Sequence, residues 1–384
     1  MAILKPQHQP PSSPLRGRAV WACTVWILLL AIVLSATGCR DEQPAVPRVH
    51  KAPVEGAKVI FPDHGAYAGA YIDFGETEDD VSLEAIDRFE TMVGKHQAII
   101  ASSSYWGEQS FPTKNVELIS RHGAIPLLFW SPWGSPYAED RPPDDFRLEN
   151  ILAGKWDSYI DQWADAACGV NRPILVSWGL EMNGRWFPWS GVHYGGGKPL
   201  SPEQPQRYAG PEMYKQAYRY VVARVRARGA QQILWVFHAN NLSFPAAPWN
   251  RIAQYYPGGD YVDVLGLSAY GQLFPDGPWV SLATAMDDAY QELCRLDPHK
   301  PILLAEYGVG EFPKSGDKAG WVTEALAALE IRYPRIKGAV YWHERWQNQN
   351  ETISNLRINS SPEALAAYRQ AMAKPYWVGT LLAQ

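Results

Sequence analysis

The sequence predicts an α/β protein that folds as a (β/α)8 TIM barrel, in a single domain after an N-terminal leader and tether. Eight short β-rich segments alternate with helical patterns from residue 58 onward. Most of these segments are continuous apolar runs rich in Val, Ile and Leu, as expected of parallel strands buried on both faces. An open doubly wound sheet is the alternative, but it usually carries a glycine-rich turn after its first strand, and none is seen here.

The expected strands occupy residues 69–74, 97–103, 125–130, 173–178, 232–238, 262–269, 301–306 and 338–342. Helical periodicity predicts helices over residues 82–93, 115–122, 144–168, 211–228, 280–296, 318–333 and 362–372. Ser82 is the expected N-cap of the first helix. After the fifth strand only residues 249–256 are available, so the helix there should be reduced.

The N-terminus has the pattern of a secretory signal. Lys5, Arg16 and Arg18 precede an apolar run over residues 19–34, and small residues then lead to Cys39. Gly38–Cys39 resembles a bacterial lipoprotein cleavage site, at which the cysteine is lipidated. A retained membrane anchor is the alternative.

This pattern divides the chain into a leader over residues 1–39, a proline-containing flexible tether over 40–57 and the barrel domain over 58–384. We expect an extracytoplasmic protein of the bacterial cell envelope, tethered to the membrane through a lipid on Cys39, or else a secreted one.

Composition narrows the function. The formal charge is −5 and no basic stripe is present, so nucleic acid is not an expected partner. Seventeen tryptophans exceed ordinary core needs and favour a sugar-binding cleft. Cys168 and Cys294 lie on helical patterns and are expected as buried thiols rather than a disulfide. We expect a monomer that needs no cofactor, and a metal site built from His238 and His343 has no supporting spacing.

Two glutamates follow apolar strand patterns and suggest the chemistry. Glu181 comes just after the fourth strand, in the segment WGLEMNGRWFPW, and Glu306 ends the seventh, in PILLAEYG. Strands four and seven face each other across a barrel, so both carboxyl groups can converge on one bound sugar. Aromatic surroundings desolvate a carboxyl group and raise its pKa, as a general acid requires. A gap of about 5–5.5 Å would indicate a retaining glycosidase and about 6.5–9.5 Å an inverting one.

The segments EMNGRWFPW, YVDVLGLSAY and LLAEYG resemble those of glycoside hydrolase family 26, in the same order along residues 60–372. That family holds endo-β-mannanases, mixed-linkage β-glucanases and β-1,3-xylanases. The resemblance implies that Glu181 is the acid/base and Glu306 the nucleophile. It also implies that Tyr270 holds the nucleophile, that Trp186 lines the cleft and that Trp342 forms an aromatic floor.

One position departs from the family pattern. The family commonly has histidine directly before the acid/base, whereas this chain has Leu180. The departure bears on the substrate more than on the chemistry, because both carboxyl groups are present.

Other candidates carry open alternatives. Asn183, Trp130 and His238 lie at or beyond strand ends and could contact sugar, but core packing explains Trp130 equally well and loop shaping explains Asn183 equally well. Glu181 could instead be a structural partner of Arg185.

The sequence therefore predicts a retaining, endo-acting β-glycanase that hydrolyses β-1,4-linked mannan or a related β-glucan by double displacement. The alternatives are a non-catalytic glycan-binding lipoprotein on a degenerate barrel and a transglycosylase.

Overall fold

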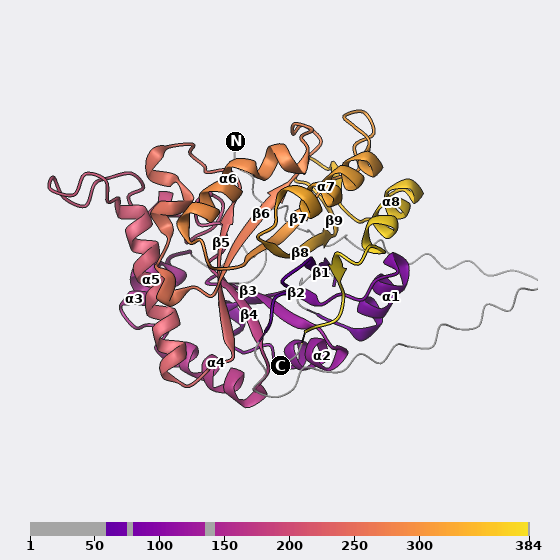
Figure 1. Cartoon of the computed structure of the whole chain (residues 1–384). Helices are drawn as coiled ribbons and strands as arrows, with labels where there is room; N and C mark the ends of the chain where they lie inside the picture. Colours follow the sequence, from indigo (N-terminus) through magenta and orange to yellow (C-terminus); the bar gives the residue numbers. More distant parts are fainter. Residues whose placement is uncertain (1–58, 75–79, 135–142, 383–384) are drawn as a thin grey trace, which may run out of the picture.

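The computed structural model describes residues 59–74, 80–134 and 143–382. Eight parallel strands follow one another in chain order, and β1 pairs with β8 to close the barrel. Figure 1 shows the strands at the centre, with helices arranged around them. The barrel strands are β1 (Ala66–Ile72), β2 (Ile99–Tyr105), β3 (Ile125–Ser131), β4 (Ile174–Trp178), β5 (Ile233–Asn240), β6 (Val264–Tyr270), β7 (Ile302–Gly308) and β8 (Ile336–His343).

Each of the eight predicted strands is present, with ends that shift by up to three residues. Almost every residue of these strands is buried. The reason is that one strand face fills the barrel interior and the other packs against the helices. The TIM-barrel prediction is therefore confirmed.

The helices form the outer layer. Ser82 accepts a hydrogen bond from the Ala85 backbone nitrogen and caps α1, as expected. The main helices are α1 (Leu83–Val93), α2 (Thr113–His122), α3 (Leu148–Leu152), α4 (Asp157–Val170), α5 (Ala209–Ala227), α6 (Leu282–Leu296), α7 (Lys318–Arg332) and α8 (Pro362–Met372).

Short 3-10 turns and strands complete the described chain. The 3-10 turns are η1 (Trp106–Glu108), η2 (Pro143–Phe146), η3 (Gly191–Tyr194), η4 (Pro248–Asn250), η5 (Ile252–Tyr255) and η6 (Gly259–Tyr261). Strands β9 (Arg345–Gln347) and β10 (Ile353–Asn355) form an antiparallel pair beyond β8, and β11 (Trp377–Val378) pairs with the start of β1. The reduced helix predicted over residues 249–256 is present only as η4 and η5.

The prediction of one continuous helix over residues 144–168 was wrong. The segment is divided into η2, α3 and α4, and the break contains Gly154 at φ 80°. A right-handed helix cannot continue through that conformation. The break lets Trp156 stack on Phe146, with ring centroids 4.8 Å apart. Aromatic packing therefore prevails over local helical periodicity.

Both described cysteines are free thiols, as expected, but they are only partly buried. Cys168 on α4 directs its Sγ toward the Arg228 carbonyl, 3.7 Å away, at the edge of the helical layer. The two thiols are therefore less buried than the sequence predicted.

The leader, the tether, Cys23 and Cys39 lie outside the described residues. Within the part of the chain that the structure describes, no helix has both the length and the apolar character to cross a bilayer.

Candidate active site

Glu181 is placed by an unusual turn after β4. Gly179 and Glu181 have φ values of 57° and 54°, in the left-handed region that non-glycine residues rarely adopt. The turn is fixed because the Glu181 backbone nitrogen donates to the His238 carbonyl (2.7 Å) and the Gly184 nitrogen donates to the Glu181 carbonyl (2.8 Å). Strained backbone of this kind is concentrated at functional sites, where surrounding contacts maintain it.

Glu306 is placed by an irregularity in β7. The pairing register of β7 shifts between Leu267 and Ser268 on the β6 side, and between Leu304 and Tyr307 on the β8 side. Such bulges re-aim individual side chains. Here the irregularity sets Glu306 opposite Ser268, near the C-terminal end of the strand.

Tyr270 connects the two glutamates electrostatically. Its hydroxyl donates to Oε2 of Glu306 at 2.7 Å. Burial, followed by the charge and hydrogen bond of Glu306 and the charges of Glu181 and Glu344, raises the pKa of Tyr270 well above its usual value. Tyr270 therefore remains a protonated donor, and the carboxyl groups of Glu181, Glu306 and Glu344 all lie near it. The structure thus brings together the two glutamates predicted from sequence.

Trp186 contacts Glu181 directly. Its indole Nε1 donates to Oε2 of Glu181 at 2.7 Å. The ring is partly exposed and meets Phe244 edge-on, with centroids 5.5 Å apart. The indole is therefore in a position to orient the carboxyl group as well as to offer an aromatic surface.

Trp342, at the end of β8, packs beside these groups. Its ring stacks on Tyr71 with centroids 3.9 Å apart and planes within 7°. Its Nε1 donates to Glu344. Glu344 directly follows β8, and its contact with Trp342 and its proximity to Tyr270 were not predicted from the sequence. A carboxylate two residues after a strand-end tryptophan is the signal that was available.

Three residues that the sequence predicted to contact sugar are instead enclosed by other parts of the protein. Trp130 is fully buried, stacks on Trp163 and donates to the Tyr159 hydroxyl, so it belongs to the layer between barrel and helices. His238 is fully buried between the hydroxyls of Ser177 (3.0 Å) and Ser268 (2.7 Å). These positions do not fit direct contact with substrate.

Asn183 is likewise buried within its loop. Its side chain bonds to the backbone of Asn240 in both directions, and its carbonyl accepts from the Asn250 side chain. It therefore shapes the loop that carries Trp186, which was the alternative left open by the sequence. Arg185, the alternative structural partner of Glu181, is exposed to solvent.

The sequence profile described as glycosyl hydrolase family 26 matches residues 147–356, which is more than half of the chain. The chain belongs to glycosyl hydrolase family 26. The matched segment includes β4 to β8 and therefore Glu181, Tyr270, Glu306 and Trp342.

Two curated relatives show how the similarity is distributed. Endoglucanase H of Acetivibrio thermocellus is 30% identical over 295 residues, which cover 76% of this chain and 29% of that protein. The mannan endo-1,4-beta-mannosidase of Bacillus subtilis is 24% identical over 246 residues, which cover 63% of this chain and 58% of that protein. This family 26 chain thus spans 29% and 58% of these relatives, less than two thirds of the length of either.

Solved structures confirm the fold. The catalytic domain of a Bacillus sp. JAMB-750 endo-beta-1,4-mannanase superposes with a TM-score of 0.59 at 18% identity, covering 84% of this chain and 93% of that one. The Bacillus subtilis mannanase man26 superposes with a TM-score of 0.52 at 19% identity, covering 83% and 87%. At these identities the likeness establishes the barrel alone.

The buried His238 of this family 26 barrel predicts a pH dependence of stability. Burial lowers the pKa of His238 to about 3, so the folded chain keeps it neutral while the unfolded chain takes up a proton below about pH 6.5. The contribution of neutral His238 to the unfolding free energy is therefore fully present above pH 6.5 and decreases as the pH falls. Between about pH 6.5 and pH 5 we expect the wild type to lose about 1.5 kcal/mol more unfolding free energy than His238→Gln. Urea unfolding at the two pH values measures this difference.

The matched control is Val236→Ala, a cavity substitution at a fully buried position of the same strand. It should lower the unfolding free energy by a similar amount at both pH values. Identical pH dependence in the wild type and His238→Gln would contradict the assignment of a neutral histidine.

Proposed function

We propose that this family 26 chain is a retaining, endo-acting β-glycanase in which Glu306 is the nucleophile and Glu181 the acid/base. The observation that carries the proposal is the placement of both glutamates beside Tyr270, at the ends of β7 and β4. The side chains are almost completely buried, with residue exposures of 8% for Glu181 and 5% for Glu306. Shielding from water is one of the environments that suit a carboxyl group to acid catalysis.

In the first step, the Glu306 carboxylate attacks the anomeric carbon. The bond from that carbon to the leaving oxygen breaks while Glu181 gives its proton to this oxygen, and a glycosyl ester forms on Glu306. The indole Nε1–H of Trp186, already bonded to Oε2 of Glu181, holds the acid in one orientation and stabilises the carboxylate that this step creates.

In the second step, Glu181 removes a proton from water as the water oxygen attacks the same carbon. The ester bond breaks, and Glu306 leaves as a carboxylate. The Tyr270 hydroxyl donates to Oε2 of Glu306 and so stabilises the charged form at the start and end of the cycle. Apart from the sugar and water, the reaction therefore uses only groups of this chain: Glu306 supplies the attacking electron pair, and Glu181 transfers the proton.

The proposed substrate is a β-1,4-linked mannan or a related β-glucan. The names of the two curated relatives, an endoglucanase and a mannan endo-1,4-beta-mannosidase, support this class. Leu180 is buried beside Glu181 and cannot donate a hydrogen bond to a sugar hydroxyl from its side chain. With one side-chain donor fewer at this point, the site depends more on aromatic surfaces such as Trp186. Both mannan and β-glucan are therefore tested as substrates.

The central prediction concerns products released from polysaccharides. Incubation with mannan, glucomannan, mixed-linkage β-glucan and xylan is expected to release oligosaccharides from at least one β-1,4-linked mannan or β-glucan. Glu306→Ala should abolish release while it retains glycan binding, because only the nucleophile is lost. Glu181→Ala should slow release by about 10²- to 10⁴-fold, the usual contribution of a general acid. Chromatography of the products measures both effects.

Glu324→Gln is the matched control, because Glu324 is exposed on α7, away from the barrel end that holds the site. It should retain wild-type product release. Near wild-type turnover in Glu306→Ala would rule out Glu306 as nucleophile, and release from xylan alone would overturn the substrate class.

A second prediction concerns Tyr270. Tyr270→Phe removes one hydrogen bond to a charged group and leaves the ring in place, so kcat should fall by about 10- to 100-fold. KM for the same glycan should change less, because the bond stabilises the nucleophile rather than the bound sugar. Steady-state kinetics separate the two constants. Tyr218→Phe, at a fully buried tyrosine of α5, is the control, and an equal loss in both variants would contradict a specific role for Tyr270.

We also propose that the chain is a lipoprotein, modified on Cys39 and held at the outer face of a bacterial membrane. The support is the basic, apolar and small-residue order of residues 5–39. Cys39→Ser is expected to move the protein from the membrane fraction to the soluble fraction of expressing cells, as measured by immunoblotting. Unchanged membrane association would instead indicate a retained anchor.

A further inference from the structure

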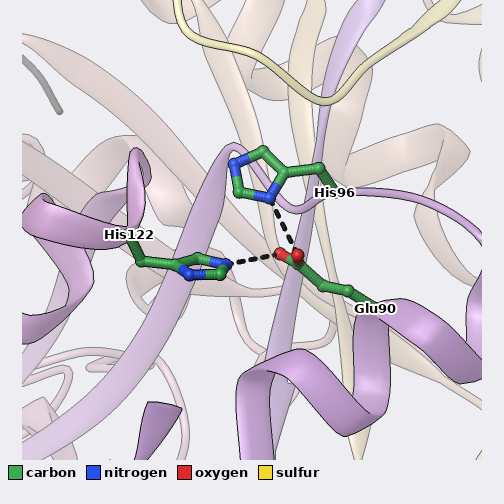
Figure 2. Close-up of side chains that lie close together, drawn as sticks. All are labelled: Glu90, His96 and His122. Carbon is green, nitrogen blue, oxygen red and sulfur yellow. Dashed lines mark hydrogen bonds and ion pairs between the residues drawn. The ribbon is translucent and has the colours of Figure 1, made fainter. Parts of the chain in front are cut away.

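A second group of chemically active side chains lies at the opposite end of the barrel from Glu181 and Glu306. It consists of Glu90 on α1, His96 in the connection from α1 to β2, and His122 at the end of α2. Figure 2 shows both imidazole rings directed at the Glu90 carboxylate. The connections that follow the helices lie at the N-terminal face of a TIM barrel, where function is not usually found.

The three side chains are close and well shielded. Nδ1 of His96 lies 2.8 Å from Oε2 of Glu90, and Nε2 of His122 lies 3.1 Å from Oε1. One ligand atom from each residue lies within 4.8 Å of the other two. The side-chain exposures are 13% for Glu90, 7% for His96 and 11% for His122. The donor atoms therefore face one another across a small space with limited access to water.

We propose that Glu90, His96 and His122 form a binding site for a divalent transition-metal ion of the zinc class. Two imidazole nitrogens and one carboxylate are a donor set that suits Zn²⁺ and its transition-metal neighbours, whereas Ca²⁺ and Mg²⁺ prefer oxygen ligands. With metal–ligand bonds of about 2.0–2.1 Å, tetrahedral donors lie about 3.3 Å apart. The two short separations here are near that value, so small side-chain adjustments can admit an ion.

The surroundings of the three donors support the same assignment. The Gln97 backbone nitrogen donates to Oε1 of Glu90 at 2.8 Å and fixes the carboxylate. The other ring nitrogen of His122, Nδ1, lies 3.8 Å from the Asp87 carboxylate. Metal-binding histidines commonly direct their second ring nitrogen at a carboxylate, which sets the tautomer that coordinates. Asp87 lies just beyond hydrogen-bond distance in this structure, and we assign it as the partner that positions His122 when the ion binds; water would supply the remaining ligand.

Binding would connect α1, α2 and the start of β2 through one ion. On coordination, each imidazole nitrogen that faces Glu90 gives a lone pair to the ion, and any proton on that nitrogen passes to solvent. The role is structural, because the site lies far from the proposed catalytic pair along the barrel axis. An ion that binds only the folded chain raises its thermal stability.

The test uses the full chain, purified in detergent and stripped of metal with a chelator. Zn²⁺ is then titrated by calorimetry, and bound metal is counted by elemental analysis after dialysis. We expect one Zn²⁺ per chain, a rise in melting temperature on Zn²⁺ addition that the chelator reverses, and visible absorption typical of tetrahedral coordination when Co²⁺ replaces it.

Two variants test the ligands, and a third is the control. Glu90→Gln and His122→Ala should weaken Zn²⁺ binding by more than about 100-fold, the upper range for loss of an outer contact. His299→Ala removes an exposed histidine beyond α6 and should leave binding unchanged. Circular dichroism confirms that each variant is folded before titration.

Two results would overturn the proposal. The first is a stripped wild-type chain that binds no Zn²⁺ tighter than about millimolar, in which case the cluster is only a hydrogen-bonded clamp. The second is wild-type affinity in folded Glu90→Gln and His122→Ala, which would place the ion elsewhere. Both results are independent of glycan hydrolysis, so they do not depend on the proposed function.

Discussion

The pairing of β1 with β8 is the constraint on which the rest of this molecule depends. Residues from Tyr67 to Ile72 pair with residues from Gly338 to His343, so a segment near the start of the described chain is joined to one 271 residues later. Closure brings the C-terminal ends of all eight strands to one rim. Without it, Glu181 after β4 and Glu306 in β7 would belong to separate parts of a sheet and could not both approach Tyr270.

Local irregularities in the backbone then direct the two glutamate side chains within the closed barrel. The left-handed conformation of Glu181 and the register shift around Glu306 both occur where an ordinary strand would direct the side chain elsewhere. Buried groups beneath the rim maintain these departures. His238 is bonded to Ser177 and Ser268, and its carbonyl accepts from the Glu181 nitrogen, so a neutral core histidine supports the proposed acid/base.

The sequence predicted the barrel because period and composition report directly on burial, and it predicted Glu181 and Glu306 because each ends an apolar run. It could not place Trp130 or His238, because a strand-end residue faces either the rim or the core, and only strand register decides between them. It also missed the Glu90 cluster, whose members lie up to 32 residues apart and meet only after α1 and α2 pack. The helix over residues 144–168 failed because tertiary stacking of Trp156 on Phe146 outweighs local propensity.

In the proposed mechanism, Glu306 forms the covalent bond to the sugar. A 2-fluoro-substituted glycosyl fluoride, matched to the sugar that the enzyme releases, slows the second step and traps the ester on the nucleophile. Mass spectrometry of the digested protein is predicted to find one added sugar on the peptide that contains Glu306, and none in Glu306→Ala. A label on Glu181 or Glu344, or full inactivation with no covalent label, would contradict a nucleophilic role for Glu306.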